Sequence, residues 1–360
     1  MNISKRGRDI QPSPIRKLKP LADEAQERGI HVYFLNIGQP DIPTPQPILD
    51  AFHNYDEKVL SYGPAQGFLE LRQAIADYFK SYNISLDSEN VIITIGGSEA
   101  IYFSFSVVAD PGQEIIIPEP FYTNYNGFAS FASVKIVPLT LRVEDGFRLP
   151  SKKEIEARIT SKTKAILLCS PNNPTGTVCT PEELERVISV AKKHGLFLIG
   201  DEVYKEFVYD GGTHKSILEY EEVSDRVIVV DSISKRFSSC GARIGAVLTK
   251  NKELYGSLLK FAQARLCPPS VEQQAALAAY RMGRDYFQPV KEEYEKRRDV
   301  LYEGLKDIPG IVIHKPQGAF YLIVRLPIKD AEHFVCWMLT DFHLDRQTVM
   351  VAPGEGFYCT

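Results

Sequence analysis

Short apolar runs alternate with helical sequence patterns through the middle of the chain, and this alternation restricts the fold more than any other feature. Each run is aliphatic and is bounded by Gly, Pro, Asp or Asn, as buried strands are. Strands that alternate with helices form a mostly parallel sheet covered by helices. The expected strands are Val91–Ile95, Glu114–Ile117, Ala165–Cys169, Leu196–Ile199, Val227–Val230 and Ala246–Thr249.

One helix between two of these strands is well marked. Thr180 can cap its N-terminus, Pro181 stands at the first helical position, and Glu183 completes a capping box. Apolar residues then recur on one face until Gly195, which ends the helix. A strand, a helix and a strand within about thirty residues make the βαβ unit of a parallel sheet.

The pattern changes after about residue 270. Ser270 and Gln273 predict a second capping box, and a long charged helix follows Pro289. Apolar strands are expected at Ala319–Val324 and Val349–Ala352, with a helical pattern between them, which is an α+β arrangement. For 360 residues we therefore expect an N-terminal arm that also joins the small domain over 1–40, a large domain over 41–283, and a small domain over 284–360.

Composition excludes several classes of protein. The 42 basic and 46 acidic residues leave a net charge of −4, which disfavours a nucleic-acid binder that relies on bulk positive charge. The longest apolar run, Ala319–Val324, is too short to span a bilayer, and no apolar segment follows the basic N-terminus as in a secretory signal. The six cysteines and seven histidines lack metal-ligand spacing, so we expect reduced thiols, no metal and a cytoplasmic location.

Ligands of a parallel α/β sheet bind beyond the carboxyl ends of its strands, so the residues that follow each strand are the candidates for a site. After the first strand, Gly96 and Gly97 open a helix with Ser98 and Glu99. Backbone N–H groups at such a helix start can hold a phosphate. A structural turn without any ligand also explains the two glycines.

Two further segments carry polar side chains at strand ends. Asn172 and Asn173 lie between Pro171 and Pro174, which stiffen the loop, and either amide could serve the turn or face a ligand. Asp201 follows a buried apolar strand, where a carboxylate either caps a helix or faces a cationic group.

The fourth segment contains Lys235, which alone would be read as a surface lysine. Ser232 and Ser234, which carry hydroxyls, precede it, and Arg243 follows eight residues later. Hydroxyls and a guanidinium suit a phosphate, and a lysine beside them suits the covalent capture of an aldehyde.

Spacing joins these segments. Asn173 and Asp201 are 28 residues apart, and Asp201 and Lys235 are 34 residues apart. Each interval is close to one strand–helix–strand repeat, so the three side chains are expected at the same edge of the sheet. A phosphate site, an aldehyde-capturing lysine and a carboxylate for a ring nitrogen together describe the chemistry of pyridoxal 5′-phosphate (PLP).

With these motifs the chain resembles the class I/II aminotransferases, which are PLP-dependent enzymes of fold type I and include aspartate aminotransferases. The resemblance runs from about Asn36 to the last residue. Its most specific pieces are Ser170–Gly176 (S-P-N-N-P-T-G), Asp201–Tyr204 (D-E-V-Y) and Ser232–Gly245 (S-I-S-K-R-F-S-S-C-G-A-R-I-G).

The resemblance implies a role for each of these residues. Lys235 would hold PLP as a Schiff base and then shuttle a proton, Asp201 would pair with the ring nitrogen, and Tyr204 would hydrogen-bond the phenolic oxygen. Asn173 would share that contact and also border the substrate. The phosphate would be held by Arg243, Ser232, Ser234 and the backbone of Gly97, Ser98 and Glu99.

Three more residues match contacts of the family. Tyr122 would stack on the ring of PLP, although a core tyrosine would look the same in sequence. Tyr62 would reach the phosphate across the interface of a homodimer whose subunits share active sites. Gly38 would contact the substrate carboxylate through its backbone.

Two departures from the family pattern concern substrate binding. The family carries a carboxylate-binding arginine shortly beyond the segment that is Pro353–Phe357 here, and this sequence ends before that position, so we expect a truncated small domain. Many bacterial aspartate-type members place a lysine for the distal carboxylate where this chain has Ser98.

The resemblance implies an aminotransferase that moves an amino group from an L-amino acid, with aspartate favoured, to a 2-oxo acid such as 2-oxoglutarate by a ping-pong mechanism. A C–S lyase or a cyclopropane-forming synthase on the same fold is the alternative, because both would use the same lysine. A ligand-sensing domain of a transcription factor is not expected, because the residues before Asn36 cannot hold a helix-turn-helix domain.

Overall fold

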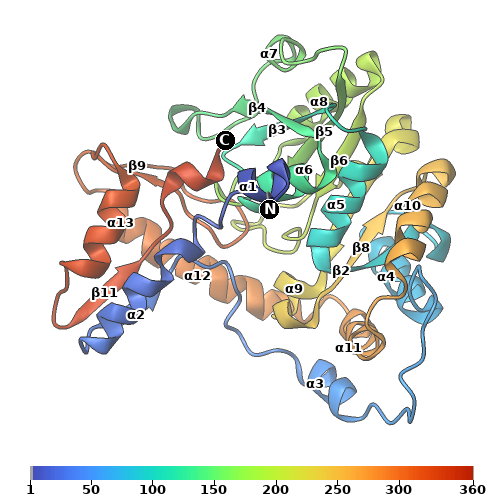
Figure 1. The fold of residues 1–360 in the computed structure, drawn as a ribbon, viewed down its shortest axis with the longest axis horizontal. Coiled ribbons are helices and arrows are strands. Elements are labelled where there is room, and N and C mark those ends of the chain that lie inside the picture. The colour runs from blue at the N-terminus through green and yellow to red at the C-terminus, as the bar shows by residue number, and fades with distance from the viewer. Residues whose placement is uncertain (1–2, 360) are drawn as a thin grey trace.

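A seven-stranded sheet forms the centre of the protein, for which a computed structural model describes residues 3–359 (Figure 1). The strand order is β2-β8-β7-β6-β5-β3-β4. Neighbouring strands are parallel except where β8 pairs with β2 and β7. The expected α/β class with a mostly parallel sheet is confirmed. The strands are β2 (Val91–Ile95), β3 (Glu114–Glu119), β4 (Lys135–Thr140), β5 (Thr163–Cys169), β6 (Phe197–Asp201), β7 (Val227–Ser232) and β8 (Ile244–Leu248).

All six strands expected from the apolar runs are present, with bounds shifted by up to a few residues. One strand of the sheet was not predicted: β4, which lies at the edge of the sheet beside β3. Its Pro138 argues against a strand, but an edge strand tolerates proline because one of its sides needs no partner.

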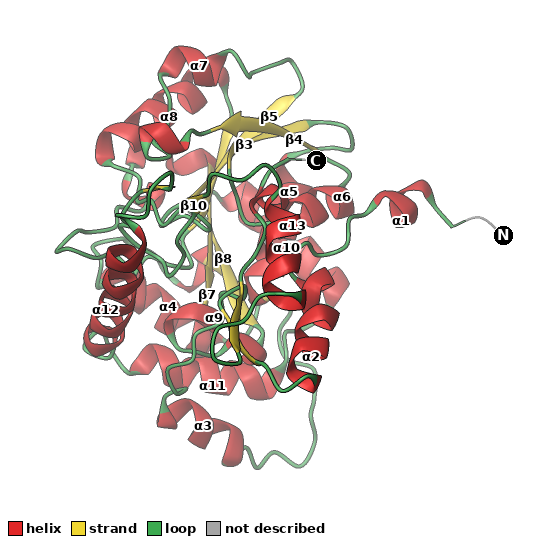
Figure 2. Ribbon diagram, turned by 90° about the vertical axis from the view of Figure 1, so that its left-hand side faces the viewer, coloured by secondary structure: helices red, strands yellow, loops and turns green. Residues whose placement is uncertain are grey.

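Helices cover both faces of the sheet, which is seen nearly edge-on in Figure 2. On one face α5 (Gly96–Val108), α6 (Asn124–Ala132) and α10 (Lys252–Arg265) pack on strand residues such as Ile115 and Ile117. On the other face α4 (Leu69–Lys80), α8 (Pro181–His194) and α11 (Ser270–Arg281) pack on residues such as Ile116. Successive side chains of β3 thus enter opposite cores, as the pleat of a strand requires. Shorter helices complete this part: α3 (Gln46–His53), α7 (Lys152–Glu156) and α9 (Ile233–Arg236).

The two predicted capping boxes had different outcomes. Helix α8 begins as expected, because Thr180 accepts from the backbone of Glu183 and the Glu183 carboxylate accepts from the backbone of Thr180. The box at the start of α11 was wrong. There the Gln273 side chain accepts from the Phe68 backbone instead, at 2.8 Å, and so joins α11 to the segment before α4.

Segments from the two ends of the chain form a second, smaller unit. Figure 1 shows α2 (Lys19–Glu27) beside α13 (Ala331–Thr340), and β1 (His31–Phe34) pairs in parallel with β11 (Gln347–Met350). The remaining elements are α1 (Lys5–Asp9), α12 (Phe287–Leu305), β9 (Val312–Ile313) and β10 (Val324–Arg325).

Two strand predictions in this unit need correction. Within Ala319–Val324 only Val324 is in a strand, because Ala319 has a φ of +55° and Gly318 forms an isolated bridge with Val208 instead. The strand predicted at Val349–Ala352 begins two residues earlier, as β11. The domain bounds remain a prediction. Residues 1 and 2 of the predicted N-terminal arm and residue 360 of the predicted small domain lie outside the described residues. None of the helices formed by residues 3–359 is long and apolar enough to cross a membrane.

We predict that Gly245→Ala destabilises the fold, whereas the same substitution at Gly256 does not. A Cβ at Gly245 in β8 would lie 2.5 Å from the Gly96 carbonyl carbon and 2.8 Å from the Gly97 nitrogen, both backbone atoms that cannot turn away. Overpacking of this kind costs about 1–3 kcal/mol. At Gly256 in α10 the added Cβ meets nothing within 4 Å, and alanine should stabilise the helix by about 0.5–1 kcal/mol. Urea unfolding of both variants measures the difference, and equal effects would contradict the prediction.

Candidate functional site

The carboxyl ends of β5, β6 and β7 bring the main candidate residues to one edge of the sheet. Cys169 at the end of β5 pairs in register with Asp201 at the end of β6, and Asp201 pairs in turn with Val230 of β7. The loop after β5 carries Asn173, and the short helix α9 after β7 carries Lys235. The structure therefore brings Asn173, Asp201 and Lys235 together, as their spacing predicted.

The side chain of Lys235 is partly buried at this edge of the sheet. Its Nζ donates to the carbonyl oxygen of Gly38 at 2.6 Å and lies 3.9 Å from the Cys240 sulfur. Burial lowers the pKa of Lys235 and Arg243 lowers it further, against the opposing effects of Cys240 and Asp201. A lower pKa leaves a larger share of the amine uncharged at neutral pH, and the uncharged amine is the form that attacks an aldehyde.

Asp201 is buried with half of its carboxylate occupied. Oδ2 accepts a hydrogen bond of 2.6 Å from the hydroxyl of Tyr125, whereas Oδ1 has no hydrogen-bond partner among the described residues. Burial raises the pKa of Asp201 to about 6, against the opposing hydrogen bond from Tyr125. The free oxygen fits a protonated ring nitrogen, which would supply both a donor and a positive charge.

The two asparagines of the loop Ser170–Gly176 differ in their hydrogen bonds. Oδ1 of Asn172 accepts from the backbone and the hydroxyl of Thr175, so this residue shapes the turn. Oδ1 of Asn173 is buried and lacks a hydrogen bond within residues 3–359. The amide left for a ligand is therefore that of Asn173. The loop is held by Gly176, whose carbonyl accepts from the backbone of Gln317 and Gly318.

Groups that suit an anion meet where α5 begins. Gly96 has a φ of +72°, and a Cβ there would lie 2.3 Å from Nη2 of Arg243, so this guanidinium lies directly over the start of the helix. The N–H groups of Gly97, Ser98 and Glu99 are in the first turn of α5, where a helix leaves its donors free. A guanidinium above free helical N–H groups fits a phosphate.

Not every group expected at the phosphate is equally free. The Ser232 hydroxyl caps α9 by accepting from the Ser234 backbone at 3.1 Å. It also lies within hydrogen-bond distance of the carbonyl of Ile244 and the hydroxyl of Ser234. The Glu99 carboxylate accepts from the Ile95 backbone and lies 3.5 Å from Arg265, so only the backbone of Glu99 remains for a ligand.

Tyrosines line the site. The hydroxyl of Tyr204 contacts that of Tyr321, and the ring of Tyr122 packs edge-on against Tyr125 with centroids 5.5 Å apart. Tyr321 and Tyr125 were not predicted from the sequence. Tyr125 lies in α6, three residues after Tyr122, and this short spacing from a candidate site residue was the available signal for it. A Cβ at Gly38 would overlap the Tyr321 hydroxyl, which explains why the chain has glycine there.

Tyr62 is the predicted site residue that the single chain does not bring to this edge. Its side chain is 82% exposed and makes none of the side-chain hydrogen bonds found within residues 3–359.

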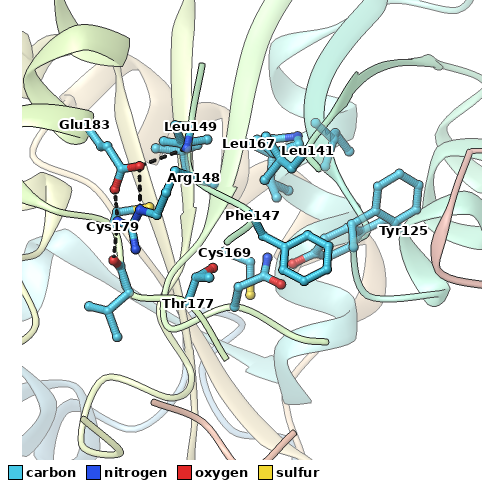
Figure 3. Close-up of a pocket in the computed structure, with 16 residues that line it drawn as sticks. Tyr125, Leu141, Phe147, Arg148, Leu149, Leu167, Cys169, Thr177, Cys179 and Glu183 are labelled. Carbon is cyan, nitrogen blue, oxygen red and sulfur yellow. Dashed lines mark hydrogen bonds and ion pairs between the residues drawn. The ribbon is translucent and has the colours of Figure 1, made fainter. Parts of the chain in front are cut away.

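A small cavity lies behind the Ser170–Gly176 loop, and Tyr125 of the site is one of the residues that line it (Figure 3). It measures about 20 Å³, enough for about one water molecule, and is lined by residues such as Cys169, Cys179 and Phe147. Figure 3 shows Glu183 beside it, bound to Arg148 and to the backbone of Leu149. The cavity is too small for a coenzyme, so the functional site is the edge that carries Lys235.

Comparisons with known proteins agree with this geometry. The family model for aminotransferase class I and II matches residues 30–360. The aspartate aminotransferase of Sulfurisphaera tokodaii is 40% identical over 341 residues, which cover 92% of this chain and 83% of that protein. The structure of aspartate aminotransferase from Thermotoga maritima has a TM-score of 0.91 at 30% identity and covers 99% of this chain and 92% of its own. That of alanine aminotransferase from Pyrococcus furiosus has a TM-score of 0.90 at 32% identity with the same coverage.

We predict that Asp201→Asn stabilises the coenzyme-free protein at high pH. Because the pKa of Asp201 is raised from 3.8 to about 6, the folded protein keeps this proton at pH values where the unfolded chain has lost it. The wild type therefore loses stability as the pH rises from about 4 past 6, and asparagine does not titrate. The difference should be small near pH 4 and about 3 kcal/mol at pH 8.

Urea unfolding of the coenzyme-free proteins across this pH range measures the effect. Asp307→Asn, which removes an exposed carboxylate, is the control and should show no such trend. A stability difference for Asp201→Asn that does not grow with pH would contradict the prediction.

Proposed function

We propose, from the premise that this chain belongs to the class I and II aminotransferases of fold type I, that it moves the amino group of aspartate to a 2-oxo acid such as 2-oxoglutarate. The chain is a PLP-dependent aminotransferase. The aspartate donor is supported by the relatives, of which several are aspartate aminotransferases. The observation that carries the proposal is that the partly buried amine of Lys235, the half-occupied carboxylate of Asp201 and the free amide oxygen of Asn173 meet at one edge of the sheet.

The residues present fit PLP. Bound there, PLP supplies an aldehyde that condenses with amines and a ring that takes up electrons from the substrate Cα. The amine of Lys235 would hold PLP through that aldehyde. Arg243, Ser232, Ser234 and the first amides of α5 would hold its phosphate, and the Ser232 hydroxyl also caps α9.

Each remaining residue would bind, orient or move a proton. Asp201 Oδ1 would keep a proton on the ring nitrogen, and Tyr125 holds the other carboxylate oxygen so that Oδ1 points one way. Asn173 and Tyr204 would donate to the phenolic oxygen, and Tyr122 would cover one face of the ring. When the substrate amine has replaced Lys235, the freed Nζ can carry a proton from Cα.

A ping-pong order is part of this proposal. One site holds one transferred amino group at a time, so the amino acid would leave its amino group there and depart as a 2-oxo acid before the second 2-oxo acid enters. The Gly38 backbone borders the amine of Lys235 and would contact the substrate carboxylate.

We also propose a homodimer with shared active sites and a cytoplasmic location. The dimer is supported by the exposed apolar segment around Tyr62, in which Val59 is 71% and Leu60 is 70% exposed to solvent. Apolar side chains exposed together in this way are typical of a protein–protein interface. Cys169, Cys179, Cys240, Cys267 and Cys336 form no disulfide among residues 3–359, as in proteins of a reducing compartment.

Aspartate alone should convert the bound coenzyme to its amine form in a single turnover, faster than alanine or tyrosine does. Stopped-flow absorbance of the purified, coenzyme-loaded protein follows the conversion. Lys235→Ala should slow it by at least about 10⁴-fold, because acid–base catalysis at Cα is lost. Lys260→Ala, which removes an exposed lysine of α10, is the control. A faster alanine or tyrosine reaction would contradict the donor, and full activity of Lys235→Ala would contradict the site.

The shared site can be tested by mixing two defective subunits. Tyr62→Ala should weaken coenzyme binding, and Lys235→Ala should abolish turnover. In a mixed dimer, one site combines the intact Lys235 of one subunit with the intact Tyr62 of the other. We therefore expect mixing to restore tight coenzyme binding and turnover in up to half of the sites of each mixed dimer. Activity no higher than the sum of the separate variants would contradict a shared site.

A further inference from the structure

Four charged side chains are buried together directly behind the lysine turn, which is the segment from the end of β7 through α9 that carries Lys235. They are the quartet Lys205, Glu206, Asp231 and Arg236, and both Asp231 and Arg236 are completely inaccessible to solvent. None of the four belongs to the groups that would hold the coenzyme or the substrate.

Each cation of the quartet contacts both carboxylates. Arg236 forms an ion pair with Asp231 and lies 3.3 Å from Oε1 of Glu206. Lys205 lies 3.2 Å from Oδ2 of Asp231 and 3.5 Å from Oε1 of Glu206. The four side chains thus form a closed, electrically neutral ring.

Aromatic side chains from α4 and α11 enclose the ring. Tyr78 donates to Glu206, and Tyr280 donates to Oδ2 of Asp231 at 3.2 Å. The ammonium of Lys205 lies 4.1 Å from the ring centroid of Phe79, and the guanidinium of Arg236 lies 5.1 Å from that of Tyr78. Cations over aromatic faces are held in place as well as attracted.

Stability alone is a weak reason to keep such a ring. Removing charges from water is costly, and replacing a buried ion cluster by well-packed apolar residues is often neutral or stabilising. The cost is visible here, because burial and the nearby Arg236 lower the pKa of Lys205 to about 7. A buried ring does restrict the positions of its members, because a charge that moved away from its partners would be left uncompensated in the interior.

The places of the four residues in the chain show what they fix. Arg236 directly follows Lys235, and Asp231 lies in β7 just before the same turn. Lys205 and Glu206 directly follow Tyr204, in the segment that begins with Asp201. The ring therefore joins the turn that carries the amine to the segment that carries the carboxylate and the phenol.

We propose that the quartet Lys205, Glu206, Asp231 and Arg236 consists of positioning residues that fix the Lys235 amine relative to Asp201 and Tyr204. This inference rests on the proposed role of Lys235. The ring acts through the backbone of α9 and of the segment after β6, not by contact with the reacting atoms.

The test compares Arg236→Met with a matched control, Arg148→Met. The control also removes the guanidinium partner of a buried carboxylate, because Arg148 forms an ion pair with Glu183. Both of these residues are distant in sequence from Lys235. In the coenzyme-loaded enzymes we measure unfolding by urea, the dissociation constant of PLP, and the pH midpoint of the coenzyme absorbance. Both variants should lose stability. Arg236→Met alone should move the midpoint by at least one pH unit and weaken PLP binding at least tenfold.

Two further variants separate position from charge and guard against a variant that does not fold. Arg236→Lys keeps the charge and should restore part of the wild-type midpoint. The double variant Asp231→Asn with Arg236→Met keeps the ring neutral, and we expect it to remain shifted because the geometry is lost. A double variant with the wild-type midpoint would show that only charge matters and would overturn the proposal.

The same data distinguish this inference from the proposed function. If Lys235→Ala retains the pH-dependent absorbance, the role of Lys235 is wrong and the positioning proposal fails with it. If that absorbance is lost but Arg236→Met has the wild-type midpoint, the positioning proposal alone is overturned.

Discussion

The register between β5, β6 and β7 is the constraint on which the site depends. Because Cys169 pairs with Asp201 and Asp201 with Val230, the three parallel strands end within two residues of one another. Whatever follows each strand then emerges at one edge, and here that is an amide, a carboxylate and an amine. A slip of one residue in β6 would turn Asp201 to the opposite face of the sheet and separate it from Lys235.

Asp201 and Lys235 at this edge have pKa values that differ from those they would have in water. Asp201 is buried with one oxygen free, and the Lys235 amine has its pKa lowered by burial. Tyr125 and the quartet behind α9 are the contacts that keep these groups in place. These buried charged groups therefore lower the stability of the fold but hold the reactive groups in fixed positions. Groups with shifted pKa values are typical of functional sites.

The sequence predicted the parts of the fold that depend on local patterns. Apolar runs located six strands of the central sheet, and the Thr180 box located the start of α8. Spacing was enough to place Asn173, Asp201 and Lys235 at one edge. The failures are long-range. Gln273 accepts from the Phe68 backbone across the fold, and Gly318 pairs with Val208 where a strand from Ala319 onward was predicted. Tyr125, Tyr321 and the quartet could not be recognised, because their partners are distant in sequence and their residue types are common in cores and on surfaces.

The most direct test of this account is to find which amine the coenzyme occupies. Borohydride reduction of the PLP-loaded protein followed by peptide mapping fixes the coenzyme to its lysine. The account predicts about one pyridoxyl group per chain, on the peptide that contains Lys235. A label on another lysine would contradict it, above all on Lys205, whose pKa is also lowered by burial.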